Sequence, residues 1–258
     1  MKAIASWLAL FGLLAWPALG YDLQTQGLFK SNYALPMAYE ADSPEGRTDQ
    51  EAKYRISLYQ RVYAWGPNAI YFAYTQTSWW QLYDQENSRP FRETNYNPEF
   101  FLALPPLDVW GEPWLHLGYE HESNGGREPW SRSWDRIYAR YGLDWEGLRL
   151  RHKVFFRLPE KAKEYPSDPK GDENPDIVEY YGINEVEVIL PLGDLEIYNK
   201  IRYNAAEGRG SNESNLTYPS GLPGIFLMLQ YFQGYGESLI DYNRQVTKWS
   251  VGFSLNRS

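Results

Sequence analysis

The chain has 258 residues, a formal net charge of −8 and no cysteine, and 17% of its residues are aromatic. The acidic balance argues against nucleic acid as a partner, and the lack of cysteine excludes disulfides, thiolate metal sites and a cysteine nucleophile. An aromatic-rich chain of this kind fits either a soluble secreted β protein or a transmembrane β-barrel with aromatic girdles at both membrane interfaces.

The first twenty residues have the pattern of a secretory signal peptide. Lys2 supplies the basic start, residues 5–16 form a short apolar core, and Ala18-Leu19-Gly20 is a cleavage site of small residues. The apolar core is short for a membrane-spanning helix, so an uncleaved anchor is the weaker alternative. We therefore expect a signal peptide at residues 1–20 and a single β-barrel domain at residues 21–258.

The remaining chain contains repeated runs of alternating apolar and polar residues separated by turns rich in Gly, Pro, Asp and Asn. In residues 52–63, for example, Ile56 and Leu58 oppose Arg55 and Ser57. About twelve such runs are found, an even number as single-chain barrels require. The predicted strands are residues 27–37, 52–63, 68–80, 97–104, 112–123, 133–141, 148–158, 185–190, 195–203, 212–221, 225–233 and 248–255.

Alternation alone does not distinguish a membrane barrel from a soluble β-sandwich, because both have one apolar and one polar face. The polar faces carry charges of both signs, and buried charges must be paired. Mixed signs therefore favour an all-β fold, a transmembrane antiparallel β-barrel of about twelve strands with a narrow lumen. The predicted lumen charges are Lys53, Arg55, Arg61, Arg136, Arg140, Arg149, Arg151 and Lys153 against Glu120, Glu122, Glu185, Glu187 and Glu196. Two longer charged loops, residues 40–50 and 161–175, are expected on the aqueous side of the membrane.

Three polar residues lie on the predicted apolar faces of neighbouring strands. His121 and Ser123 are in phase with Leu117 and Tyr119, and Asp135 is in phase with Ile137 across the turn. A nucleophile, a base and a carboxylate thus gather on a surface that faces lipid. A lone His-x-Ser pair is a weak motif, and a histidine in the interfacial belt beside a turn serine is the structural alternative.

Longer sequence blocks resemble the outer-membrane phospholipase A family. They run in order from about Glu51 to Asn243: residues 74–81, 90–96, 121–125 with 129 and 131–136, 172–176 and 234–243. The resemblance implies a twelve-stranded barrel in the bacterial outer membrane that hydrolyses acyl esters of phospholipids, with A1, A2 and lysophospholipase activity. It also implies activity as a calcium-dependent homodimer and dormancy as a monomer.

Carried over residue by residue, the resemblance makes Ser123 the nucleophile and His121 its general base. The third family position falls on Asp135, where the best-known members have asparagine. An aspartate holds the same histidine tautomer and stabilises imidazolium better, but it places a charge near lipid.

The resemblance also implies a calcium site and a dimer contact. The Ca²⁺ ligands would be the Ser131 hydroxyl, the Gly126 carbonyl and a partner-chain backbone oxygen at the position of Ser88, and oxygen ligands suit Ca²⁺. The Gly125 amide would stabilise the oxyanion. Gln76 matches a glutamine at the family's dimer interface. The chain ends in Asn256-Arg257-Ser258 rather than in an aromatic residue, and Phe253 is the nearest candidate for that terminal signal.

Two other functional classes remain open from the sequence. One is a non-enzymatic barrel, structural or a narrow channel, in which the histidine and serine are incidental. The other is a soluble β-sandwich esterase, whose outward aliphatic residues would need cover from a second sheet.

Overall fold

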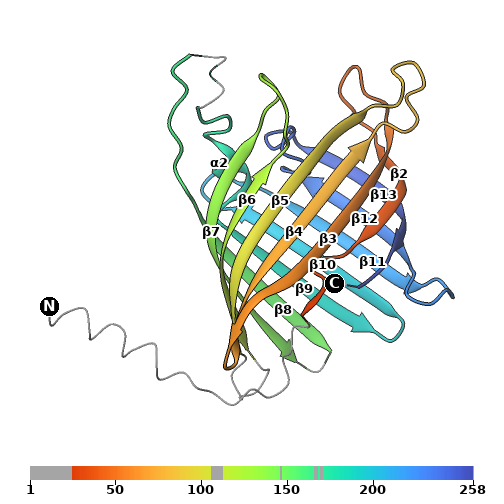
Figure 1. Ribbon diagram of the computed structural model, residues 1–258. Coiled ribbons are helices and arrows are strands. Elements are labelled where there is room, and N and C mark those ends of the chain that lie inside the picture. The colour runs from red at the N-terminus through yellow and green to blue at the C-terminus, as the bar shows by residue number, and fades with distance from the viewer. Residues whose placement is uncertain (1–24, 106–112, 146, 166–167, 169–170, 258) are drawn as a thin grey trace, which may run out of the picture.

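The computed structural model describes residues 25–105, 113–145, 147–165, 168 and 171–257, which form one antiparallel sheet (Figure 1). The predicted signal peptide lies outside the described residues. The elements are β1 Gln26–Leu28, β2 Tyr33–Glu40, β3 Gln50–Trp65, β4 Asn68–Trp80, β5 Phe91–Leu104, β6 Trp114–Ser123, β7 Ser133–Trp145, β8 Leu148–Arg157, α2 Ile177–Tyr181, β9 Asn184–Leu192, β10 Leu195–Asn204, β11 Arg209–Pro219, β12 Phe226–Gly234 and β13 Val246–Ser254.

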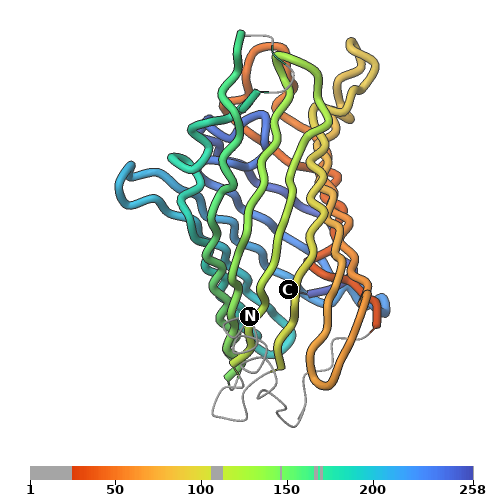
Figure 2. The backbone as a smooth tube through the Cα atoms, turned by 60° about the vertical axis from the view of Figure 1, so that its left-hand side comes forward, coloured from red at the N-terminus to blue at the C-terminus, as the bar shows by residue number. Residues whose placement is uncertain are grey.

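The sheet closes into a barrel. Each strand from β2 to β13 pairs with the next along the chain, and β13 pairs back to β2, which gives twelve strands in the described wall. Figure 2 shows this wall from the side. The short β1 pairs with the part of β3 around Tyr59, beyond the stretch that β2 covers. The predicted barrel is thus confirmed, and the predicted strand at residues 27–37 divides into β1 and β2.

The two faces of each strand differ as the alternation predicts. Along β4, buried residues such as Tyr71 and Ala73 alternate with partly exposed ones such as Phe72 and Tyr74. Outward residues elsewhere are large and apolar, including Ile56 and Leu229. Among the described residues, no helix is long and apolar enough to cross a membrane. The exposed apolar residues of alternate strand positions form a belt on the outer surface of the barrel.

Ion pairs fill the lumen. Glu120 contacts Arg136 at 2.9 Å and Lys153 at 2.6 Å, while Glu187 lies 2.7 Å from Arg140. These are pairs between residues that the sequence predicts to face the lumen. A polar cavity of about 330 Å³ remains between them, lined largely by charged side chains. The interior is closed by paired charges, as expected for a narrow barrel.

The loop of residues 235–245 enters one mouth of the barrel. Glu237 and Leu239 are buried there, and the Leu239 amide donates to Asn95 Oδ1 on β5 at 3.0 Å. Asp241 binds Arg47 of the predicted loop at residues 40–50 at 2.7 Å. The charged loop therefore lies at the same end as the inserted loop, and both help to close that mouth.

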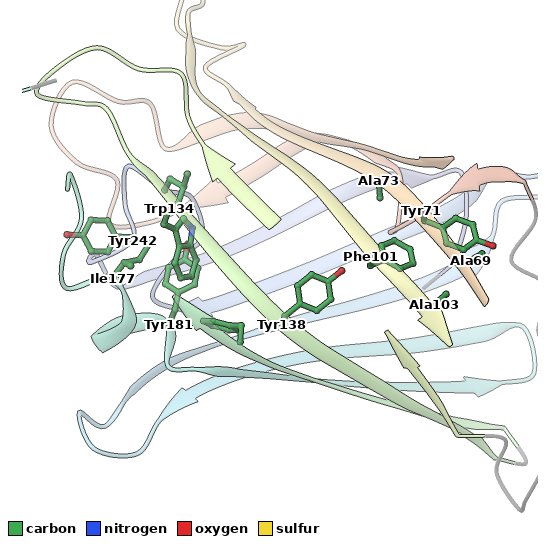
Figure 3. Close-up of a cluster of buried hydrophobic side chains, with 12 residues drawn as sticks. Ala69, Tyr71, Ala73, Phe101, Ala103, Trp134, Tyr138, Ile177, Tyr181 and Tyr242 are labelled. Carbon is green, nitrogen blue, oxygen red and sulfur yellow. The ribbon is translucent and has the colours of Figure 1, made fainter. Parts of the chain in front are cut away.

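Buried aromatic residues pack inside the barrel in two places (Figure 3). One group contains Tyr71 and Phe101, whose rings stack with centroids 5.3 Å apart. The other contains Trp134 and Tyr181, with centroids 5.2 Å apart in an edge-to-face arrangement. The second group joins β7 to the unpredicted helix α2. It lies directly behind the strand that carries Asp135.

Candidate active site

The hairpin of β6 and β7 carries the predicted catalytic residues. Its register pairs His121 with Asp135 and Ser123 with Ser133. Leu117 and Tyr119 on the same strand are exposed, whereas Glu120 is buried in the lumen, so the odd-numbered residues point outward. The alternation therefore places the polar residues on the membrane-facing surface, as predicted.

His121 and Asp135 form a direct pair. The imidazole Nδ1 lies 2.9 Å from Asp135 Oδ1. The His121 side chain is 36% exposed and the Asp135 side chain is 31% exposed. This geometry fits an Nδ1–H that donates to the carboxylate and leaves Nε2 as the proton acceptor. The Tyr119 hydroxyl also donates to Asp135 Oδ1, at 2.6 Å. Sequence reasoning missed Tyr119, although its place two residues before His121 marks it as a same-face neighbour.

Ser123 ends β6 beside this pair. It is partly exposed, two residues from His121 on the same face, and in register with Tyr96 of β5. Among the described residues, its hydroxyl makes no hydrogen bond with His121. Catalytic hydrogen bonds often tighten only when substrate binds, so the lack of this bond does not conflict with the predicted roles of Ser123 and His121.

The Asn124 side chain connects the two ends of the loop that follows Ser123 by hydrogen bonds. Its Oδ1 accepts from the amides of Gly126 and Arg132, each at 3.0 Å, and its Nδ2 donates to the Trp130 carbonyl at 2.8 Å. A side chain at Gly126 would come within 2.9 Å of that carbonyl oxygen. The two ends of the loop therefore approach closely, and Gly126 is brought near Ser131. The sequence shows a turn signal at Asn124-Gly125-Gly126, but it does not predict the hydrogen bonds of the Asn124 side chain.

Gly125 has a positive φ of 61°, a conformation that favours glycine. Within the described part of the chain its amide donates no hydrogen bond. The N–H is thus available to an acceptor next to Ser123, as an oxyanion donor requires.

The loop and β7 are supported from the lumen side. Buried Asn174 accepts a hydrogen bond from the Ser133 amide through Oδ1 at 3.2 Å. Arg132 lies over the ring of Tyr242, a residue of the inserted loop, with its guanidinium carbon 5.9 Å from the centroid. The inserted loop therefore reaches from the mouth of the barrel to the loop between β6 and β7.

The two remaining predicted residues lie on or beside β4. Gln76 is on its outward face, where it accepts from the Tyr74 hydroxyl at 3.0 Å and donates to Ser78 at 3.2 Å. Ser88 is in the turn between β4 and β5 with a φ of 62°. Among the described residues, neither forms a hydrogen bond with the His121–Asp135 pair, and Ser88 is exposed.

The fit to calcium rests on neutral oxygens. Across the described residues, no group of three or more His, Asp and Glu side chains is placed to hold a metal. The oxygens predicted to bind calcium in the loop that Asn124 bridges, the Gly126 carbonyl and the Ser131 hydroxyl, are instead neutral. These are hard oxygen donors, which suit Ca²⁺ and leave room for waters and a ligand from another chain.

Comparisons with known proteins agree with this architecture. A family model described as phospholipase A1 matches residues 24–255. The phospholipase A1 of Escherichia coli K12 is 37% identical over 221 residues, 83% of this chain and 73% of that protein. That of Proteus vulgaris is 33% identical over 88% of this chain and 80% of its own length.

Solved structures match over nearly the whole barrel. The outer membrane phospholipase A of Escherichia coli superposes with a TM-score of 0.82 and 32% identity, covering 90% of this chain and 99% of that one. A Salmonella typhi outer membrane phospholipase, described as a dimer with bound calcium, has a TM-score of 0.82 and 31% identity over 92% of this chain and 94% of that one. The barrel is that of a multi-pass protein of the bacterial outer membrane. The chain belongs to the phospholipase A1 family.

Proposed function

We propose that this protein is a calcium-dependent phospholipase of the outer membrane that cleaves acyl esters of phospholipids and lysophospholipids at both glycerol positions. Residues 1–20 would direct export and be removed, leaving residues 21–258 as one barrel domain. The observation that carries the proposal is the His121–Asp135 pair at 2.9 Å on the membrane-facing surface, with Ser123 on the same face.

The chemistry follows from the tautomer that Asp135 imposes. His121 Nε2 takes the proton of the Ser123 hydroxyl as its oxygen attacks the ester carbonyl. The tetrahedral intermediate places its oxyanion at the Gly125 amide. His121 then returns the proton to the glycerol oxygen as the carbon–oxygen bond breaks. Water, deprotonated by His121, later attacks the acyl-serine ester, and His121 returns this proton to the Ser123 oxygen as the fatty acid leaves.

The membrane-facing position accounts for the substrate class. An acyl chain in the bilayer can lie along Leu117 and Ile137 while its ester reaches the polar residues above them. A soluble esterase would gain nothing from catalytic residues on a membrane-facing surface. The apolar belt therefore supports a lipid ester as substrate.

The calcium ion would be held by the Gly126 carbonyl, the Ser131 hydroxyl and the Ser88 carbonyl of a second copy. When bound, it would add positive charge beside the oxyanion. Because this chain supplies only neutral donors there, we expect weak binding, with a Kd of about 10⁻⁴ to 10⁻³ M. A shared site would also make activity depend on a homodimer, with Gln76 at the interface.

Fatty-acid release from mixed micelles of phospholipid and detergent tests the proposal. The refolded mature chain is assayed with calcium or with chelator, alongside Ser123→Ala. We expect release that requires both calcium and Ser123. No release from a folded, calcium-loaded dimer would favour the alternative of a structural or transport barrel.

A further inference from the structure

The Asp135 carboxylate has a second donor besides His121. Tyr119 pairs with Ile137 in the β6–β7 register, which makes Asp135 its diagonal neighbour on the outward face. Diagonal cross-strand residues are within reach of an aromatic side chain. The hydroxyl donates to Asp135 Oδ1 at 2.6 Å, and His121 Nδ1 lies 2.9 Å from the same oxygen.

An ionised carboxylate on this surface needs such support. Asp135 is 31% exposed on a face whose neighbours Leu117 and Ile137 are apolar and exposed. Burial of a charge against lipid is costly unless hydrogen bonds compensate it. Hydrogen bonds to a charged acceptor are about twice as strong as those between neutral groups. The Tyr119 hydroxyl compensates the carboxylate without adding another charge.

Because Tyr119 and His121 bond the same oxygen, Asp135 Oδ1, the tyrosine also fixes the orientation of the carboxylate. A carboxylate held only by His121 can rotate about its Cβ–Cγ bond and move Oδ1 away from Nδ1. A tyrosine anchored on the neighbouring strand restricts that rotation. The restricted rotation is relevant here because this chain has an aspartate at a position where, by resemblance, the best-known family members have asparagine.

We propose that Tyr119 is a positioning residue of the proposed triad: its hydroxyl holds the Asp135 carboxylate so that Oδ1 stays aimed at His121 Nδ1. The inference rests on the proposed function, because it assigns Tyr119 a role in that same site. Tyr119 acts through Asp135 and does not itself contact the Ser123 hydroxyl among the described residues.

A double-mutant cycle with Tyr119→Phe and Asp135→Asn tests the coupling. Alone, Tyr119→Phe lowers kcat about tenfold and leaves KM unchanged, because it removes a hydrogen bond to a charged group and no substrate contact. In the Asp135→Asn background it changes kcat by about twofold or less, since a neutral amide does not need the second donor. Equal losses in both backgrounds would overturn the inference.

Tyr141→Phe is the matched control. Tyr141 is also an exposed tyrosine of this hairpin, and its hydroxyl bonds a histidine too, His152 Nδ1 at 2.7 Å, but away from the catalytic residues. We expect Tyr141→Phe to keep wild-type kcat. A loss as large as that of Tyr119→Phe would assign the effect to the apolar belt in general and contradict a positioning role.

A spectroscopic readout separates this inference from the proposed function. In the folded protein in micelles, ¹⁵N shifts of the histidine rings report the tautomer of His121, assigned with His121→Gln. We expect Tyr119→Phe to lower the Nδ1–H fraction, whether or not the protein is active. An unchanged tautomer would overturn the inference, while activity that survives Ser123→Ala would overturn the proposed mechanism alone.

Discussion

The lumen and the outer surface of the barrel both hold charged groups away from bulk water, yet they stabilise them differently. Inside, the Glu237 side chain is fully buried and contacts Lys53 at 3.3 Å, Lys248 at 2.8 Å and Arg92 at 3.4 Å. Outside, Asp135 is compensated by two hydrogen bonds and keeps 31% exposure. The lumen balances its carboxylates with several opposite charges, whereas the surface carboxylate has two hydrogen-bond donors and the proposed His121–Asp135 pair stays accessible.

This difference has a chemical reason. Cations placed around Asp135 would hold its charge as firmly as Lys248 holds Glu237, but they would also disfavour a positive charge on His121 during catalysis. A neutral donor such as the Tyr119 hydroxyl does not disfavour a positive charge on His121. The outer carboxylate is therefore held by neutral or histidine donors, in contrast to the lysine and arginine partners inside the barrel.

The largest effect is expected at the outer site. Asp135→Ala removes the acceptor that orients His121 and should lower kcat about 10²-fold or more, since general-base catalysis contributes about that much. Asp135→Asn should lose less activity than Asp135→Ala, because an amide oxygen can still accept a hydrogen bond from Nδ1. Fatty-acid release measures both. Equal loss in the two variants would show that charge, not orientation, is the property that matters.

Loss of one lumen carboxylate should cost stability instead of activity. Glu237→Gln leaves buried cations without their shared partner and should lower the free energy of unfolding by about 3–5 kcal/mol. Urea unfolding in micelles measures this. The matched control is Glu179→Gln, which breaks an exposed pair with Arg209 and should cost about 1 kcal/mol or less. A similar cost for both variants would contradict the role of burial.

A charge on the apolar belt should be costly because no partner is present in lipid. Leu229 lies in the middle of β12, exposed on the outward face. Leu229→Arg should lower the free energy of unfolding in bilayers by about 2–4 kcal/mol. Leu222→Arg, in the exposed turn before β12, should change it little. If both substitutions were neutral, the face of β12 would not be the one in contact with lipid.

The smallest expected effect concerns the calcium ligands. Ser131→Ala removes one neutral hydroxyl and should raise the calcium concentration needed for half-maximal release by about tenfold, with little change at saturating calcium. A calcium titration of release checks this. An unchanged titration curve would remove Ser131 from the proposed ligand set.

The sequence predicts the barrel wall well where alternation is regular. The strand at residues 68–80 matches β4, in which partly exposed and buried residues alternate from Asn68 to Thr77. In contrast, β5 begins at Phe91 and not at residue 97. In the first residues of β5, Glu93 and Asn95 point inward and Thr94 points outward. Both faces are therefore polar there, and the sequence shows no alternation of apolar and polar residues. Periodicity detects a strand only where its two faces meet different solvents.

The site was predictable in part for the same reason. His121, Ser123 and Asp135 share a phase that the sequence shows directly, and the register of β6 and β7 brings His121 and Asp135 together. Glu237 was not predictable, because it belongs to a loop, and nothing local indicates that this loop enters the lumen. The contact of Tyr119 with Asp135 depends on a diagonal register, which is fixed only when the hairpin forms.

The most direct test of the central claim is covalent labelling of the active-site serine. An alkyl phosphonate that mimics the tetrahedral intermediate is incubated with the calcium-loaded dimer in micelles, and the modified peptide is identified by mass spectrometry. We expect a single modification at Ser123, formed at least about a hundredfold more slowly in His121→Ala. Labelling at another serine of an active enzyme, or labelling of Ser123 that does not depend on His121, would contradict the proposed triad.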